Sequence, residues 1–243
     1  MQSGDAAGSC KYVVTLTFDD GFDRSSRKTA EIFEQFGLSA SINVVAKGHL
    51  DEPVDAWHRR WRRGDFGLWN DLQARGHEIM PHGYQHANKA ERPFEESKRL
   101  IEACLELFTN ELDGFDAARA VFAFPYNAST PELEAWLPEV VRAFRTRGDP
   151  IMPLPPPGQR KVTCTSFGPE PCDEHLENFV WELLTRPSGW LCYNVHGLDG
   201  EGWGPLSAGT LERLLARLVE RGDTRVLPVG AALDLARNGG GGS

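Results

Sequence analysis

Short apolar segments alternate with amphipathic helical patterns along the chain, and this alternation restricts the fold more than any other feature. The apolar segments are rich in β-branched and aromatic residues and cover 12–18, 40–45, 77–80, 120–124, 142–146, 161–166, 190–195 and 225–227. The helical patterns cover 24–37, 93–108, 129–137 and 211–222. Such alternation is typical of an α/β fold, a mostly parallel sheet or barrel with helices outside. No repeat or linker divides the chain, so it predicts a single domain.

The two ends are expected to lie outside that domain. We assign residues 1–10 to an N-terminal tail, 11–237 to the folded domain and 238–243 to a flexible Gly/Ser linker. Two segments interrupt the alternation: 48–67 is long, aromatic and basic, and 148–160 is proline-rich and predicts an ordered surface loop. Insertions of this kind can shape access to a site, although a solvated loop is the commoner case.

Charge and hydropathy exclude several classes of partner. The formal net charge of −9 argues against nucleic acid, because a phosphate backbone attracts basic surfaces. No apolar run approaches the roughly 20 residues that cross a bilayer, so we expect no membrane span. The first residues do not form an intact signal peptide, but an exported protein that has lost its signal would look the same. We expect a secreted, periplasmic or cell-surface location over a cytoplasmic one; the sequence does not indicate the oligomeric state.

Five cysteines leave the redox compartment open. None of them forms a CxxC pair of the zinc-binding type. Cys164 and Cys172 either close a small disulfide loop or are buried thiols.

Polar side chains follow four of the predicted strands. Asp19 and Asp20 end the first, "PHGYQH" follows 77–80, "PYN" follows 120–124 and His196 follows 190–195. In parallel α/β folds the carboxyl ends of the strands meet at one edge, where active sites gather. We therefore expect these side chains to converge.

Two histidines beside an aspartate pair indicate a metal site. His82 and His86 are spaced i, i+4, which predicts that both imidazoles lie on one side of a helical turn. With one carboxylate they form a two-His, one-carboxylate site that suits Zn²⁺ and also Co²⁺, Ni²⁺ or Fe²⁺. HxxxH alone is a weak signal, but Asp19 and Asp20 would repel each other without a cation between them. Asp23 is expected to cap the helix that follows it.

The motifs together carry a family resemblance. "TFDDG", "GHEIMPHGYQH", "FPY" and a late "VH" resemble the polysaccharide deacetylases of the NodB-homology type, carbohydrate esterase family four, over roughly 13–236. The resemblance implies a distorted (β/α) barrel of about seven strands with outer helices. It also implies a hydrolase that removes acetyl groups from carbohydrates, mostly N-acetyl from chitin-like or peptidoglycan-like sugars and in some members O-acetyl from xylan.

The resemblance also implies roles for individual residues. Asp19 would be the general base for a metal-activated water, His196 the acid that protonates the leaving amine, and the Tyr126 N–H an oxyanion donor. The substrate would contact Pro125, Tyr126 and Trp203, the last of these as a sugar-stacking ring. One divalent metal, zinc in preference to cobalt, nickel or iron, would be held by Asp20, His82 and His86.

The sequence departs from the family pattern at several positions. Ala123 stands where members usually have an arginine that orients the base, and Asn127 stands where glycine is usual. We expect Arg145 or Arg147 to supply the missing cation. The family's fourth-motif aspartate, which tunes the acid histidine, is not recognisable between 142 and 190; Asp199 either orients His196 or lies in a turn.

These departures leave other functions open. One alternative is an amidohydrolase of the same fold that acts on a small non-sugar amide or ureide. Another is a catalytically silent carbohydrate-binding protein. Phosphoryl transfer is set aside, because the sequence has neither a Gly-rich phosphate loop nor a second carboxylate cluster.

Overall fold

Strands and helices alternate as the sequence predicts. The computed structural model describes residues 10–47 and 60–238. All eight predicted strands are present, and the short β6 is additional. The strands are β1 (Tyr12–Asp19), β2 (Ser41–Val44), β3 (Glu78–Pro81), β4 (Val121–Ala123), β5 (Ala143–Arg147), β6 (Ile151–Met152), β7 (Lys161–Cys164), β8 (Gly189–Val195) and β9 (Thr224–Val226). The helices are α1 (Asp23–Gln35), α2 (Phe66–Ala74), α3 (Phe94–Glu111), α4 (Pro131–Trp136), α5 (Asp173–Thr185), α6 (Ala208–Val219) and α7 (Val229–Asn238).

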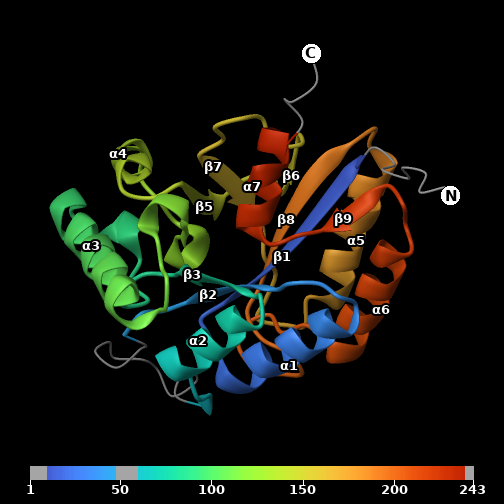
Figure 1. Cartoon of the computed structure of the whole chain (residues 1–243), viewed down its shortest axis with the longest axis horizontal. Helices are drawn as coiled ribbons and strands as arrows, with labels where there is room; N and C mark the ends of the chain where they lie inside the picture. Colours follow the sequence, from blue (N-terminus) through green and yellow to red (C-terminus); the bar gives the residue numbers. More distant parts are fainter. Residues whose placement is uncertain (1–9, 48–59, 239–243) are drawn as a thin grey trace, which may run out of the picture.

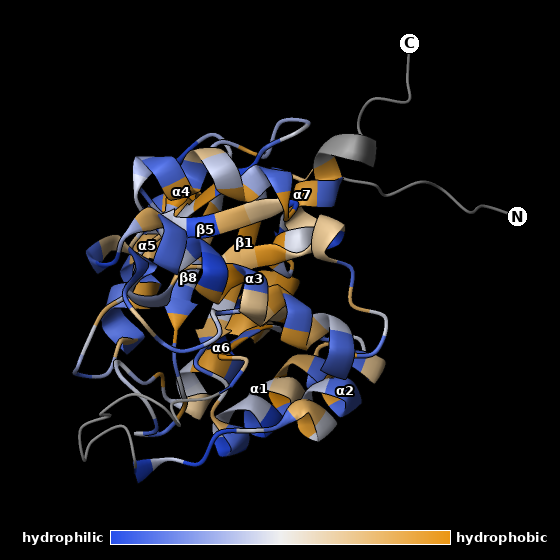
Figure 2. Cartoon of the chain, turned by 90° about the vertical axis from the view of Figure 1, so that its left-hand side faces the viewer, coloured by the Kyte–Doolittle hydropathy of each residue, from blue (hydrophilic) through white to orange (hydrophobic). Residues whose placement is uncertain are grey.

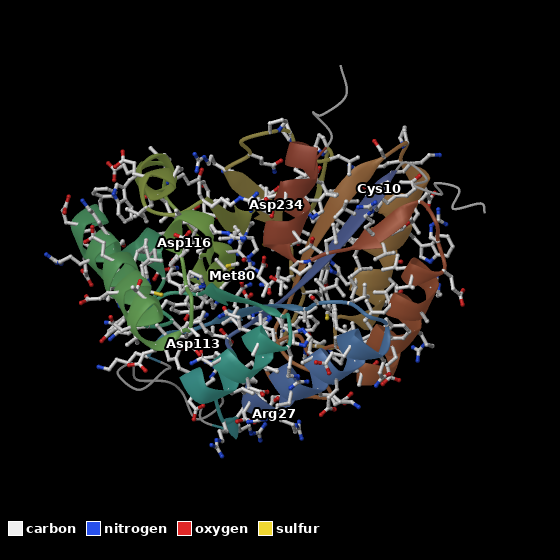
Figure 3. The ribbon with its side chains drawn as sticks, in the orientation of Figure 1. Cys10, Arg27, Met80, Asp113, Asp116 and Asp234 are labelled. Carbon is white, nitrogen blue, oxygen red and sulfur yellow. The ribbon has the colours of Figure 1, made fainter. Side chains whose placement is uncertain are left out.

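Seven of the strands surround a common interior. One parallel set runs β3-β2-β1-β8 and a second runs β4-β5-β7. A bridge between Thr165 and Tyr193 brings the end of β7 beside β8. On the other side the Val121 N–H of β4 lies 3.3 Å from Met80 Sδ of β3, near the centre of the molecule (Figure 3), and no backbone ladder joins these two described strands. The result is a distorted (β/α) barrel with helices around it (Figure 1).

Alternation along the strands sorts side chains between an outer and an inner core. On β1, Val14, Leu16 and Phe18 belong to the large apolar cluster beneath the surrounding helices. The intervening residues of β1 point into the barrel, as the period of two requires: Val13, Thr15, Thr17 and Asp19. Figure 2 shows the strands as an apolar centre under helices that turn their polar faces outward. The inner set becomes more polar toward the carboxyl end of β1, where the functional residues lie.

Helix α7 packs against the apolar end of the inner core, the end of the barrel opposite the polar residues. Val229, Ala232 and Leu233 are buried against inward-facing side chains of five strands. These side chains are small or apolar, and they are Val13, Val121, Ala143, Val162, Cys164, Trp190 and Cys192. These side chains fill the interior at the apolar end, so no channel runs through the barrel. A site can therefore form only at the polar end, where the strands have their carboxyl ends.

Helix α4 begins at a side-chain cap, whereas the cap predicted for α1 is absent. Thr130 caps α4 by accepting the Leu133 N–H, with Pro131 in the first turn. Asp23, in contrast, is already the first residue of α1 and makes no capping bond. Its carboxylate pairs with Arg27, at 2.9 Å on the outer side of the helix (Figure 3), so the capping prediction for Asp23 is wrong.

The proline-rich segment also differs from expectation. It contains β6, whose two residues pair antiparallel with β8, so it is not entirely a loop. Helices α2, α5 and α7 were not predicted, although α5 buries Leu176, Val180 and Leu183 at helical spacing. The predicted tail at 1–10 and linker at 238–243 lie almost wholly outside the described residues, as does most of the 48–67 insertion. Among the described helices, none has the length and apolar character that a bilayer crossing needs.

Gly21, at the turn after β1, requires glycine for two reasons. Its φ is +69°, and a Cβ there would lie 2.9 Å from the ring of buried Trp69. We expect Gly21→Ala to lower the free energy of unfolding by about 2 kcal/mol, from left-handed backbone strain and crowding together. Gly37→Ala is the control, because Gly37 has φ +66° and no atom within 4 Å of its Cβ position; about 1 kcal/mol is expected there. Equal losses in urea unfolding would show that Trp69 does not restrict the turn.

Candidate active site

The predicted site residues converge at the carboxyl ends of the barrel strands. Asp19 is the last residue of β1, His82 follows β3, Tyr126 follows β4 and His196 follows β8. The strands are parallel, so these positions share one edge. The strand-end rule therefore predicted correctly that these side chains converge.

Asp19 is fully buried and held by three side chains. Arg145 forms a two-pronged ion pair with it, at 3.1 Å to Oδ1 and 2.5 Å to Oδ2, and Asn43 donates to Oδ1 at 2.7 Å. His82 Nε2 lies 3.5 Å from Oδ2. Burial by itself would raise the pKa of Asp19, but the charge of Arg145 outweighs it and lowers the pKa below its ordinary value. Asp19 is therefore ionised across the neutral range.

Arg145 brings to Asp19 the cation that this chain lacks at position 123, where alanine stands instead of the family's usual arginine. Arg145 and Ala123 are direct partners in the parallel pairing of β4 and β5, so the guanidinium reaches Asp19 from the neighbouring strand. Its side chain is 0% exposed and also donates to Thr17 Oγ1 at 2.6 Å. Arg147, the other candidate, is exposed at the end of β5. Of the two predicted replacements, the structure confirms Arg145.

Asp20, His82 and His86 form a compact buried cluster. Their ligand atoms all lie within 4.8 Å of one another. Asp20 Oδ1 is 3.2 Å from His86 Nε2 and 3.6 Å from His82 Nε2. Asp20 reaches this position with φ at +76°, a left-handed backbone that is uncommon outside glycine. Charges of His86 and Arg63 lower the pKa of Asp20 well below its usual range despite the burial.

The donor chemistry of this cluster fits a divalent metal. His82 Nδ1 lies 2.9 Å from the Ala123 carbonyl oxygen, which can only accept, so Nδ1 carries the proton and Nε2 has the free lone pair. Burial lowers the pKa of His82 and favours this neutral form. Asp20 Oδ1 is buried and has no hydrogen-bond partner among the described residues. Two imidazoles and one carboxylate are a common ligand set for zinc and related ions.

The segment that carries the two histidines is not a helical turn. Residues 82–86 form an irregular bend, with Gly83 at φ +90°, so the predicted helical geometry of HxxxH is wrong. The bend is fixed by its neighbours: Ala46 N–H donates to Gly83 O at 2.9 Å, and the buried Lys89 Nζ donates to Ala87 O at 3.0 Å. The imidazole rings still lie 5.2 Å apart, because the bend returns the chain over the end of β2.

The "PYN" segment after β4 forms a tight turn beside the Asp20–His82–His86 cluster. Tyr126 and Asn127 have φ of +59° and +50°, and asparagine tolerates this region better than most residues, which explains how Asn127 replaces the usual glycine. The Tyr126 ring is 50% exposed and lies 4.6 Å from the His86 ring. Pro125 is buried, so of the two expected substrate contacts Tyr126 presents the larger surface.

His196 lies next to Trp203 but has no carboxylate partner in the described chain. Its ring is 5.3 Å from that of Trp203 and nearly perpendicular to it, and its buried Nδ1 has no hydrogen-bond partner there. Burial lowers the pKa of His196, opposed by the charges of Asp20 and Asp19. Asp199 does not orient His196: its Oδ1 accepts the Ala208 N–H at 2.9 Å, so the turn interpretation is the correct one.

Sequence reasoning missed two polar neighbours of the aspartates. Asn43 ends the inward-facing row of β2, and the strand-end rule applied to 40–45 would have found it. Arg63 lies 3.5 Å from Asp20 Oδ2, and no local signal distinguishes it from the other arginines of "HRRWRRGD". The disulfide alternative is wrong, since Cys164 and Cys172 are free; Cys164 donates its thiol to Asn127 Oδ1 at 3.3 Å.

Solved structures share this fold at low sequence identity. A protein from Mycobacterium smegmatis assigned to the polysaccharide deacetylases has a TM-score of 0.72 and 13% identity, over 96% of this chain and 92% of its own. Peptidoglycan deacetylase PdaC from Bacillus subtilis has a TM-score of 0.58 and 13% identity, over 94% and 93%. A family 4 acetyl xylan esterase from Clostridium thermocellum, in complex with a cobalt ion, has a TM-score of 0.58 and 15% identity, over 92% and 91%.

The sequence itself assigns the family. No curated protein sequence matches the chain. The family model described as "Polysaccharide deacetylase" matches residues 7–137, more than half of the 243 residues, and this stretch contains "TFDDG", both histidines of the metal cluster and "FPY". Together with the fold and the resemblance of these motifs, the match shows that the chain is a divergent member of the polysaccharide deacetylase family of enzymes.

Proposed function

We propose that the chain is a metal-dependent hydrolase that removes acetyl groups, chiefly N-acetyl, from a carbohydrate. The observation that carries the proposal is the contact between two units: the buried Asp20–His82–His86 cluster and the Asp19–Arg145 ion pair. A binding protein needs neither an arginine-paired aspartate beside two imidazoles nor an acid–base residue at the end of β8. The similar acetyl xylan esterase is in complex with a cobalt ion, which supports metal dependence in this chain.

The proposed roles follow from the positions of the side chains. Asp20, His82 and His86 hold a divalent ion, zinc in preference to cobalt, nickel or iron. When bound, such an ion acidifies water and polarises the acetyl carbonyl group. Asp19 accepts a proton from the attacking water, and Arg145 keeps its carboxylate oriented.

The remaining steps release the products. The water oxygen bonds to the carbonyl carbon, the C–N bond breaks, and the nitrogen takes a proton from His196, because an amine does not leave as an anion. The products are acetate and a free amine. The backbone N–H of Tyr126 donates to the developing oxyanion in this proposal, a contribution of typically about 2.7–4 kcal/mol. The aromatic contacts for a sugar ring in this proposal are Tyr126, beside His86, and Trp203, beside His196.

Acetate release tests this proposal directly. The protein is stripped with a chelator, reloaded separately with zinc, cobalt, nickel or iron, and given N-acetyl oligosaccharides and acetylated xylan. We expect acetate release only from reloaded protein. The substrate that releases acetate fastest identifies the sugar and shows whether an amide or an ester bond is cleaved. Release by the stripped protein would contradict metal dependence. A folded, metal-loaded protein that releases no acetate from any sugar would contradict the carbohydrate assignment, and small cyclic amides and ureides would then be tested.

A further inference from the structure

Arg63 contacts Asp20 from a segment outside the barrel strands. Its Nη1 donates to the Asp20 carbonyl oxygen at 3.0 Å and lies 3.5 Å from Asp20 Oδ2. The guanidinium also stacks on the Phe22 ring, with its central carbon 3.8 Å from the ring centroid. The side chain is only 14% exposed. A long cationic side chain held at three points has lost most of its conformational freedom, so its position is well defined.

Backbone contacts fix the segment that carries Arg63. Phe22 and Arg63 form an antiparallel bridge. On either side of it the Gly64 N–H donates to Gly21 O at 2.9 Å, and the Asp23 N–H donates to Arg62 O at 3.0 Å. The short pairing runs along the turn that follows Asp20. Main-chain hydrogen bonds thus hold Arg63 at a fixed position beside Asp20, unlike an arginine on a freely moving surface segment.

Arg63 and the histidines face different oxygens of Asp20. Oδ1 points toward His86 Nε2 and His82 Nε2, whereas Oδ2 lies beside Arg63. Arg63 also binds the carbonyl oxygen of Asp20, the residue whose φ of +76° must be maintained for the carboxylate to reach the cluster. One guanidinium therefore restrains both the backbone and the carboxylate of a single residue.

We propose that Arg63 is a positioning residue for the metal ligand Asp20, holding its carboxylate so that Oδ1 alone is offered to the ion. This inference rests on the proposed function, because it takes the cluster of Asp20, His82 and His86 as the metal site. Each aspartate of the pair then has its own arginine: Arg145 on Asp19 and Arg63 on Asp20. The two cations serve different ends, since one orients the base and the other orients a ligand.

Zinc affinity of the isolated protein tests the role of Arg63. Partners that hydrogen-bond to metal ligands typically change metal affinity by about 10–100-fold when removed. We therefore expect Arg63→Gln to bind zinc 10–100-fold more weakly than the wild type, measured by competition with a chromophoric chelator. The visible absorption of the cobalt-loaded variant is expected to change as well, because the geometry around the ion changes. A residue that served folding alone would lower the melting temperature but leave both readouts of the folded protein unaltered.

Arg62→Gln is the matched control. Arg62 is the preceding residue, carries the same charge, is 82% exposed and lies 3.9 Å from Asp23 instead of Asp20. Its removal is expected to leave zinc affinity and the cobalt spectrum unchanged. Arg63→Lys is the second variant and is used if Arg63→Gln does not fold: lysine keeps the charge but has no planar group to stack on the Phe22 ring, so its cation is held less firmly beside Asp20 and weaker zinc binding is expected there too.

The outcomes separate this inference from the proposed function. Weaker zinc binding by the folded Arg63 variants, with Arg62→Gln unchanged, supports it. Zinc binding by folded Arg63→Gln or Arg63→Lys that equals or exceeds that of the wild type would overturn the role of Arg63 and leave the proposed function intact. A wild-type protein that binds no zinc, cobalt, nickel or iron would overturn both.

Discussion

Arg145→Met is expected to lower the free energy of unfolding by about 3–5 kcal/mol, because it leaves the carboxylate of Asp19 buried without its cation. Arg145 is 0% exposed and makes two bonds to Asp19 and one to Thr17. Methionine fills much of the same space, so the loss reports mainly the uncompensated charge. Urea unfolding of the metal-free protein measures it.

The loss is expected to shrink as the pH falls. In the wild type the pKa of Asp19 is lowered by Arg145, so its contribution to stability is present above the unfolded-state pKa and disappears as the pH drops through the lower folded value. Without Arg145, burial raises the pKa of Asp19, and the folded variant gains a proton more readily than its unfolded chain. Stability curves of the two proteins should therefore approach each other toward pH 4.

Arg147→Met provides the comparison, because Arg147 lies two residues away on β5 and is exposed. A change within about 0.5 kcal/mol is expected there. If Arg145→Met cost no more than Arg147→Met at neutral pH, the Asp19–Arg145 pair would not stabilise the fold. Asp19→Asn in the Arg145→Met background is expected to recover part of the loss, since it removes the charge that was left unpaired.

The sequence predicted the strand ends well because one physical rule governs them. Parallel strands bring their carboxyl ends to one edge, so Asp19, His82 and His196 could be grouped before their separation in space was known. The strands themselves could be predicted because they are short apolar runs rich in β-branched residues, and the helices between them are amphipathic. Neither inference needed knowledge of contacts between distant residues.

Contacts set by tertiary packing were harder to predict. Arg145 and Arg147 lie two residues apart on β5 and therefore on the same face, and only the register of β5 against β4 decides which of them shares a level with Ala123. Arg63 reaches Asp20 through an antiparallel bridge of isolated residues that leaves no pattern in the sequence. The bend of the two histidines likewise depends on hydrogen bonds to the end of β2 and not on a local helical propensity.

The motif departures now have a structural explanation in two cases out of three. The arginine missing at Ala123 is replaced across the β4–β5 pair, and the glycine missing at Asn127 is replaced by a residue that tolerates φ of +50°. The aspartate that would orient His196 has no counterpart among the described residues, where His196 Nδ1 has no partner. Asp19 and the Asp20–His82–His86 cluster, the proposed base and metal ligands, are thus held by more side-chain contacts than His196, the proposed acid.

Asp19→Asn is expected to lower kcat by about 10²–10⁴-fold while leaving the metal bound. General-base catalysis is typically worth a factor of this size, and the amide cannot accept the proton. The proposed ligands, Asp20, His82 and His86, remain in place, so zinc content after dialysis should match that of the wild type. His82→Ala is expected to lose the metal and the activity together.

Asp23→Asn is the matched control for this experiment. Asp23 belongs to the same "DDGFD" stretch, but it begins α1 and pairs with Arg27 on the outside of the helix, so acetate release should not change. Because Asp19→Asn leaves Arg145 buried without its anion, thermal unfolding must first show that the variant is folded at the assay temperature. A folded, zinc-containing Asp19→Asn protein that kept more than a tenth of the wild-type kcat would place the base elsewhere. Loss of activity with zinc retained would separate the residue that takes the proton from those that hold the ion.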